Sequence, residues 1–212
     1  HRRMVGARRP AQPEVEVRGV VVGGEVVASI QKGLLVLDCH VKGKSGHAAR
    51  NEGENAIYKA LKDIEWFQNY QFTKVSETLG PIKMTVTIVN SGTLHNVVPD
   101  TCTFTVDVRV TDAYSNEDVL KIIRQFVQCE VVPRSIRLKP SSIPLEHPIV
   151  QAGIVLGKKT YGSPTTSDQS LLDIPSLKCG PGDSARSHTA DEFIYLKEKD
   201  TNKIIIVRDG RF

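Results

Sequence analysis

The sequence predicts an α+β fold, in which two helices pack on one face of a four-stranded antiparallel sheet in a split βαβ (ferredoxin-like) arrangement. The first observation is the order of periodic segments between residues 33 and 138, which runs strand, helix, strand, strand, helix, strand. The second is residues 101–110, where apolar and polar side chains alternate without a break. Such alternation is typical of a sheet that has one covered face and one open polar face.

The elements follow from local patterns, in order. Residues 34–41 alternate as a strand, and residues 55–70 place their apolar side chains at helical spacing. A turn at 78–81 precedes a second strand over 82–89, and the third strand is 101–110.

The second half of this unit begins at Ser115, which resembles a helix cap because Asp118 follows three residues later. The helix after it has apolar residues at the spacing of one helical face: Val119, Ile122, Ile123, Phe126 and Val127. We expect a short fourth strand near 135–138. On the open face of the sheet we expect Thr103, Asp107 and Arg109 to project.

The flanking segments are less regular. Residues 1–14 have no period, and 15–30 are expected to form a buried strand that breaks at Gly23-Gly24. Beyond Ser142, prolines mark a linker, residues 149–161 are a possible helix, and the remainder is rich in loop residues. We therefore divide the chain into residues 1–32, 33–142 and 143–212, with the first and last belonging to one incomplete domain.

Composition excludes several classes of function. The net charge of +4 comes largely from an arginine-rich start, and no basic stripe is interleaved with aromatic residues, so we expect no nucleic-acid partner. No apolar run approaches the length of a membrane span, and the start does not resemble a signal peptide. The four cysteines are widely spaced without a Cys-x-x-Cys pair, which favours a reducing compartment, and we expect the cytoplasm.

Three polar positions are candidates for chemistry. His188 lies in GPGDSARSHTADE, where nearby carboxylates could orient it as a zinc ligand or simply pair with it at the surface. His47 lies on a turn among small residues, as a site residue or as an exposed loop histidine. Asn96 is either an amide donor or a turn residue before Pro99. A Gly-x-Ser-x-Gly elbow, a P-loop and a dinucleotide fingerprint are all absent from the sequence.

Four blocks in order give these residues a context: KGLLVLDCHVKGKSGHAARNEGENAI, SGTLHNVVPDTCTFTVDVR, TTSD, and GPGDSARSHTADEFI. Together they resemble the acetylornithine deacetylase and succinyl-diaminopimelate desuccinylase family of dinuclear zinc amidohydrolases, which includes aminoacylases and carboxypeptidases. The resemblance runs from about residue 33 to residue 194. It implies a split βαβ lid, residues 33–142, inserted in a zinc-binding α/β domain and pairing with a second copy.

The resemblance also implies roles for single residues. His47 would reach across the homodimer to the scissile carbonyl oxygen, while Asn96 and Arg109 would contact the substrate amide and carboxylate. Thr166 and Ser167 would line the substrate pocket. His188 would be a zinc ligand, and Glu25 the counterpart of a second ligand, although Val26 and Val27 replace the proline and threonine that follow it in the family.

The function that the resemblance implies is zinc-dependent hydrolysis of an N-acyl amino acid, such as N-acetyl- or N-succinyl-ornithine, with two zinc ions and cobalt as a substitute. The family's remaining ligands and its glutamate base lie ahead of the segment seen here. We therefore expect a truncated, inactive form that does not retain zinc by itself. The alternatives are a metallo-peptidase of the same family and a non-catalytic dimerisation module.

Overall fold

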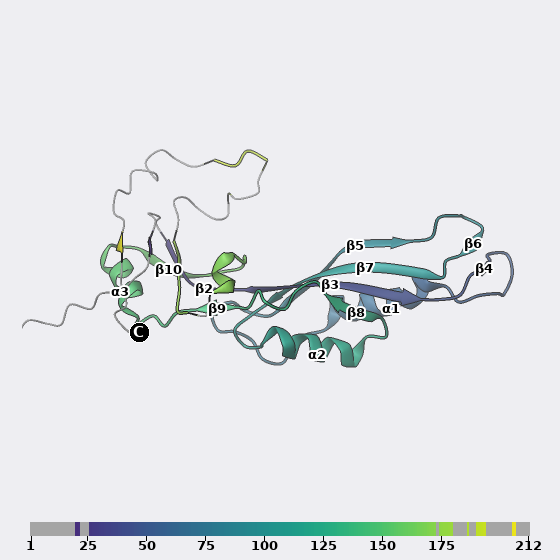
Figure 1. Ribbon diagram of the computed structural model, residues 1–212, viewed down its shortest axis with the longest axis horizontal. Helices are drawn as coiled ribbons and strands as arrows, with labels where there is room; N and C mark the ends of the chain where they lie inside the picture. Colours follow the sequence, from purple (N-terminus) through teal and green to yellow (C-terminus); the bar gives the residue numbers. More distant parts are fainter. Residues whose placement is uncertain are drawn as a thin grey trace, which may run out of the picture.

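The computed structural model describes residues 20–21, 26–172, 174–179, 186, 190–193 and 205–206. Its larger unit is a four-stranded antiparallel sheet in the order β5-β7-β3-β8. The strands are β3 (Gly33–Lys42), β5 (Lys83–Ser91), β7 (Thr101–Val110) and β8 (Glu130–Pro133). Helices α1 (Ala56–Asn69) and α2 (Asn116–Phe126) lie on one face of this sheet (Figure 1). The predicted fold class is confirmed.

Both helices begin at the residues that the sequence indicated. The side chain of Asn55 accepts the backbone N–H groups of Ile57 and Tyr58 at the start of α1. At the start of α2, Ser115 Oγ accepts the backbone N–H of Asp118. These caps satisfy amide groups that have no partner within the first turn of a helix.

The core lies between the helices and the sheet. Alternate residues of β3 and β7 point into it and are almost fully buried, among them Leu35, Leu37, Phe104, Val106 and Val108. Burial of each large apolar side chain stabilises the fold by roughly 1.5–3 kcal/mol. The two-residue period of the strands thus assigns one face to the core and leaves the other open.

The fourth strand was predicted at the wrong place. It is β8, Glu130–Pro133, whereas 135–138 form no strand. β8 pairs with β3 opposite Leu37–His40 and buries Val131 in the core. Because β8 is an edge strand, Pro133 is tolerated in it, since an edge proline need not donate to a neighbour.

A smaller unit lies beyond one end of the sheet (Figure 1). Its central strand β2 (Val26–Gln31) pairs parallel with β10 (Lys159–Ser163) and antiparallel with β11 (Lys178–Cys179) and β9 (Ser141–Ser142). It also holds α3 (Pro148–Val155) and the short 3₁₀ helix η1 (Asp168–Leu171). Strands β1 (Val20–Val21) and β12 (Ile205–Ile206) form a separate antiparallel pair.

The helix predicted over 149–161 is longer than the helix that forms. α3 ends at Val155, and Gly157 has a φ of 76°. A glycine in this left-handed conformation commonly ends a helix, and the chain then enters β10. Of the strand expected over 15–30, the described part is β1 and β2, and Gly23-Gly24 lies outside the described residues.

The domain boundaries at 32/33 and 142/143 stay a prediction. They fall where β2 passes into β3 and just after β9, between the two sheets. In the described part of the chain, none of the helices has the length and apolar character that a membrane crossing requires.

Candidate functional site

The predicted site residues that the structure describes form two separate groups. The first, which we call the tip, is the far end of the larger unit, where β4 (Gly46–His47) pairs with β6 (Val97–Val98). His47 lies opposite Val97, and the Ala48 N–H donates to the Asn96 carbonyl over 3.0 Å. The tip therefore brings together two exposed residues, His47 in β4 and Asn96 on the turn before β6.

The imidazole of His47 has a defined orientation. Its Nδ1 accepts the backbone N–H of Ala49 over 3.1 Å. A neutral ring that accepts at Nδ1 has its proton on Nε2. His47 thus presents an N–H donor at the outer end of the molecule, which is suited to a carbonyl oxygen.

Glycines allow the tip to fold this tightly. Lys44 and Glu54 exchange backbone hydrogen bonds of 2.9 and 2.8 Å. Between them Gly53 has a φ of +83°, and a Cβ there would lie 2.5 Å from the Lys44 carbonyl oxygen. A Cβ at Gly46 would lie 2.5 Å from the Glu52 carbonyl oxygen. Only glycine fits at these two positions without a shift of the backbone.

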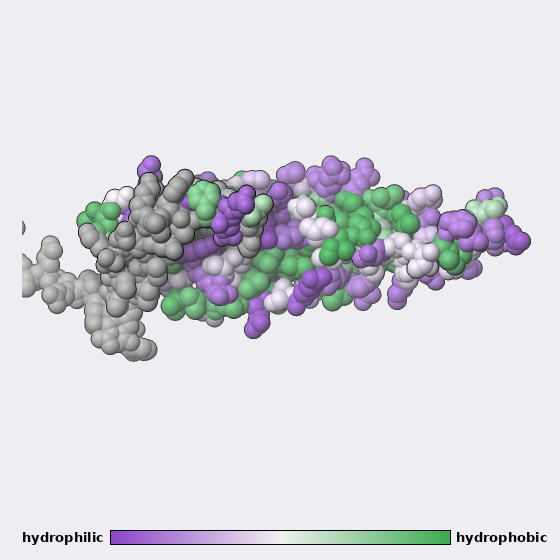
Figure 2. All heavy atoms as spheres, turned by 90° about the horizontal axis from the view of Figure 1, so that it is seen from above, coloured by the Kyte–Doolittle hydropathy of each residue, from purple (hydrophilic) through white to green (hydrophobic). Residues whose placement is uncertain are grey.

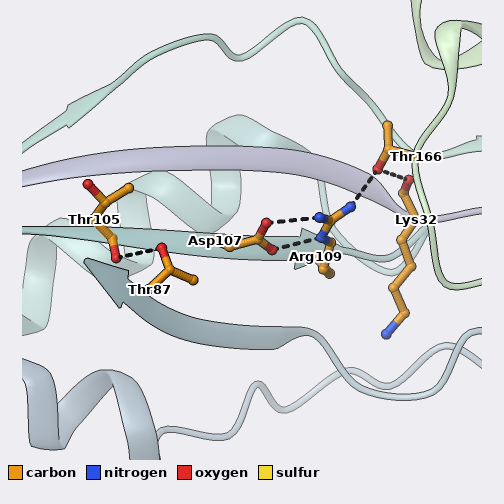
Figure 3. Close-up of polar contacts among 6 residues, drawn as sticks. All are labelled: Lys32, Thr87, Thr105, Asp107, Arg109 and Thr166. Carbon is orange, nitrogen blue, oxygen red and sulfur yellow. Dashed lines mark hydrogen bonds and ion pairs between the residues drawn. The ribbon is translucent and has the colours of Figure 1, made fainter. Parts of the chain in front are cut away.

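The second group, the junction cluster, comprises Lys32, Lys83, Asp107, Arg109 and Thr166 and lies where the two units meet. Arg109 donates from Nε and Nη2 to the two carboxylate oxygens of Asp107, over 2.7 and 2.9 Å (Figure 3). Its Nη1 reaches Thr166 Oγ1 at 3.5 Å, and this hydroxyl donates to the Lys32 carbonyl over 2.8 Å. The neighbouring Ser167 donates to Gln31 Oε1 over 2.8 Å.

The junction cluster has an excess of positive charge. Lys83 lies opposite Arg109 in the strand register, and Asp107 is the one acid of the cluster. Lys32 is 9% exposed and donates from Nζ to the Pro81 carbonyl over 2.9 Å. Burial lowers the pKa of Lys32, and repulsion from Lys83 and Arg109 lowers it further. With three cations and one carboxylate, the cluster favours binding of an anion.

The tip and the junction cluster lie at opposite ends of β7. Asn96 comes shortly before its first residue, Thr101, and Arg109 is next to its last. A strand of ten residues spans about 30 Å. A substrate as small as an acylated amino acid therefore cannot touch His47 and Arg109 of the same copy.

The two expected zinc ligands, Glu25 and His188, lie outside the described residues. Within the ranges that the structure does describe, no three His, Cys, Asp or Glu side chains gather as a metal site. The zinc ligands Glu25 and His188 therefore stay a prediction, and we assign the described residues no metal chemistry.

Sequence reasoning missed part of the junction cluster. It placed Asp107 on the open face without a role and did not single out Lys32 or Lys83. The available signal was the spacing of Asp107 and Arg109, because opposite charges two residues apart on a strand point to the same side. The proximity of Lys32 and Lys83 depends on how β2, β5 and β7 meet.

Comparison with known proteins identifies the larger unit. Residues 30–134 match the family model described as the peptidase dimerisation domain. Comparison of the sequence with curated proteins gave no match.

Solved structures share the fold at low sequence identity. A tripeptidase from Staphylococcus aureus is 20% identical with a TM-score of 0.61, and the aminopeptidase PepT from Bacillus cereus is 15% identical with a TM-score of 0.60. Each match covers 76% of this chain and 47% of the other. The Bacillus subtilis protein YxeP, described as a dinuclear metal-binding peptidase of the M20 family, is 20% identical, with coverages of 80% and 46% and a TM-score of 0.52.

The chain thus spans about half the length of these structures. Its split βαβ sheet with two helices coincides with the segment that matches the family model. Residues 30–134, which hold the split βαβ sheet, are therefore the part of this chain that resembles a peptidase dimerisation domain.

Proposed function

We propose that this chain is the lid and dimerisation part of a hydrolase that cleaves the amide bond of an N-acylated amino acid, such as N-acetyl- or N-succinyl-ornithine. The observation that carries the proposal is the separation of the tip from the junction cluster along β7. Each group is suited to one part of such a substrate, but only a second copy can supply both to one molecule. The proposed active unit is therefore a homodimer.

The outer edge of β5 supports this assembly. β5 is the last strand on its side of the sheet, so nothing in the described residues pairs with its outer edge. Unpaired backbone groups along an edge are a template for another strand. Ile88 and Val89 on β5 are 48% and 53% exposed, so the edge strand carries apolar side chains that a second strand could cover.

Helix α1 adds apolar side chains on the face of the sheet to which Val89 points, whereas Ile88, opposite Thr105, points to the other face. Asp63 and Trp66 face α2, because Asp63 contacts the segment after α2 and Trp66 stacks on Phe126. By helical spacing, Leu61 and Ile64 face the other way, toward β5. Leu61 is 52% exposed. Figure 2, which views the side that β5 occupies in Figure 1, shows apolar side chains gathered there.

Pairing of β5 with the β5 of a second copy would be antiparallel under a two-fold axis. β5 runs from Lys83, opposite Arg109, to Ser91, opposite Cys102 near the tip. Antiparallel pairing therefore places the tip of one copy on the side of its partner's junction cluster. One contact between the two β5 edges would therefore form two composite sites, each made of the tip of one copy and the junction cluster of the other.

In such a site each group performs a separable task. Arg109, in the positive junction cluster, would bind the substrate carboxylate, since a guanidinium matches a carboxylate in geometry. His47 of the other copy would donate from Nε2 to the carbonyl oxygen as negative charge develops there, and Asn96 would bind the amide. One donor of this kind typically lowers the activation barrier by about 3 kcal/mol. A metal centre, for which Glu25 and His188 are the expected ligands in this chain, would supply activated water when bound.

Mixed dimers of a longer, zinc-loaded protein that contains this chain test the proposal. His47→Ala and Arg109→Ala homodimers should each be inactive on N-acetylornithine. A dimer with one copy of each variant should have one intact composite site and one doubly defective site. Random mixing should therefore restore about a quarter of wild-type turnover. No recovery in verified mixed dimers would show that both residues act within one copy.

A peptidase is the second candidate, because two of the structural neighbours are named as a tripeptidase and an aminopeptidase. The lid would serve both reactions. Release of acetate from N-acetylornithine favours the deacylase, whereas preferential cleavage of di- and tripeptides favours the peptidase. A dimer that hydrolyses neither class would leave the dimerisation module as the function.

A further inference from the structure

The ion pair between Asp107 and Arg109 joins no two elements of the fold. The residues lie two apart on β7, and their side chains are 29% and 31% exposed. A partly exposed pair between neighbours on one strand contributes little to stability. Its main consequence is the orientation of the guanidinium, because Asp107 accepts hydrogen bonds from both Nε and Nη2.

The two hydrogen bonds to Asp107 leave other N–H groups of Arg109 available to a ligand. A guanidinium has five N–H groups. Two go to Asp107, and a third is directed at Thr166 Oγ1 over the long distance of 3.5 Å. The remaining two, on Nη1 and Nη2, find no acceptor among the described residues. Figure 3 shows one terminal nitrogen of the guanidinium directed at Thr166 and the other two nitrogens joined to Asp107.

The surroundings of these N–H groups attract anions. Lys83 lies opposite Arg109 in the register, and the repulsion that Lys32 experiences from both indicates positive charge that the cluster does not balance. A planar carboxylate is the ligand class that fits two parallel N–H donors in such a field.

We propose that Asp107 is a positioning residue, which holds the side-on edge of Arg109 so that its end-on edge is presented to a ligand carboxylate at the junction. The inference rests on the proposed function, which places the substrate carboxylate there. A positioning role and a role in screening the charge of Arg109 predict opposite changes in anion affinity when Asp107 is neutralised. Neutralising a carboxylate that only screens Arg109 would strengthen anion binding, whereas neutralising one that positions Arg109 weakens it, although the field becomes more positive.

The test uses the full 212-residue chain with succinate as the probe. The side-chain Nε–H signal of Arg109, assigned by its loss in Arg109→Lys, is followed by NMR during titration. In the wild type it should exchange slowly with water and shift on binding. Asp107→Asn should abolish the slow exchange and weaken succinate binding about tenfold, the scale of one displaced charge-assisted hydrogen bond. Asp107→Glu, which keeps the charge but not the geometry, should also bind more weakly.

A second forked pair on the same sheet is the matched control. Arg134 donates from Nε and Nη2 to Asp38 over 2.8 and 2.9 Å, away from the junction cluster. Asp38→Asn should release the Arg134 signal and leave succinate affinity unchanged. The proposal is overturned if Asp107→Asn binds succinate as tightly as the wild type or more tightly. It is equally overturned if Asp38→Asn weakens succinate binding to the same extent. The same holds if the wild-type Arg109 signal does not shift when succinate is added. Failure of the proposed function would appear instead as absent amide hydrolysis, which does not enter this measurement.

Discussion

Asp63, in the middle of α1, accepts the backbone N–H of Cys129 over 2.9 Å at the entrance to β8. Its other carboxylate oxygen accepts the N–H of Gln128 over 3.0 Å. A charged side chain that is 5% exposed thus connects the first helix to the last strand of the sheet. This contact, with Val131, fixes where β8 begins.

Replacement of Asp63 by alanine should destabilise the fold by about 2–4 kcal/mol, because two buried N–H groups lose their acceptors. A cavity of about 280 Å³ borders Asp63 and Cys129, so water can offset part of this loss. Urea unfolding measures the change. Asp63→Asn, which keeps one acceptor, should lose less, and equal losses for the two variants would contradict this account.

The pair Asp38 and Arg134 should make stability depend on pH in the acid range. Hydrogen bonds from Arg134 hold the pKa of Asp38 below its ordinary value. A carboxyl whose folded pKa is depressed stabilises the fold above its unfolded pKa of about 3.9, and this contribution disappears as pH falls through the folded pKa. Asp38→Asn should therefore lower the free energy of unfolding at pH 7 and flatten its decline toward pH 2. Glu65→Gln, at an exposed acid of α1, should retain the wild-type decline.

The β5 edge should control assembly. We expect a homodimer by sedimentation velocity at tens of micromolar, and Ile88→Lys should convert it to a monomer, because a charge at a sheet edge opposes pairing. Val132→Lys on β8 is the control, since Val132 is 43% exposed on the opposite edge strand. If Val132→Lys dissociates the dimer and Ile88→Lys does not, the interface lies on the other edge.

Gly53→Ala should destabilise the tip by more than the left-handed backbone angle of Gly53 alone accounts for. Gly80 has a similar φ of +69° but open space where a Cβ would lie, whereas at Gly53 that Cβ meets a backbone oxygen at 2.5 Å. Gly80→Ala should cost about 1 kcal/mol, the penalty of the left-handed conformation. Gly53→Ala should cost more and should also shift the NMR signals of His47. Equal costs in thermal unfolding, with His47 unmoved, would show that the loop adapts.

Much of the fold could be predicted because its signals are local. Asn55 and Ser115 cap the helices that follow them, and the alternation over 101–110 assigns each residue of β7 to a face without knowledge of its neighbours. The fourth strand was predicted too late in the chain because the four residues of β8 are too few to establish a period. Its position is set by pairing with β3 and by Asp63, more than sixty residues away in sequence.

Local sequence patterns specify the order of the elements in the larger unit, the polar face of β7 and the residue types at the tip and the junction, since these depend on spacings of a few residues. Only the tertiary structure decided which of these residues meet. Strand register separated Asn96 from Arg109 by the length of β7, and the junction of the two units brought Lys32 and Thr166 to Arg109. Contacts of this kind depend on how distant segments pack, and no local pattern encodes that packing.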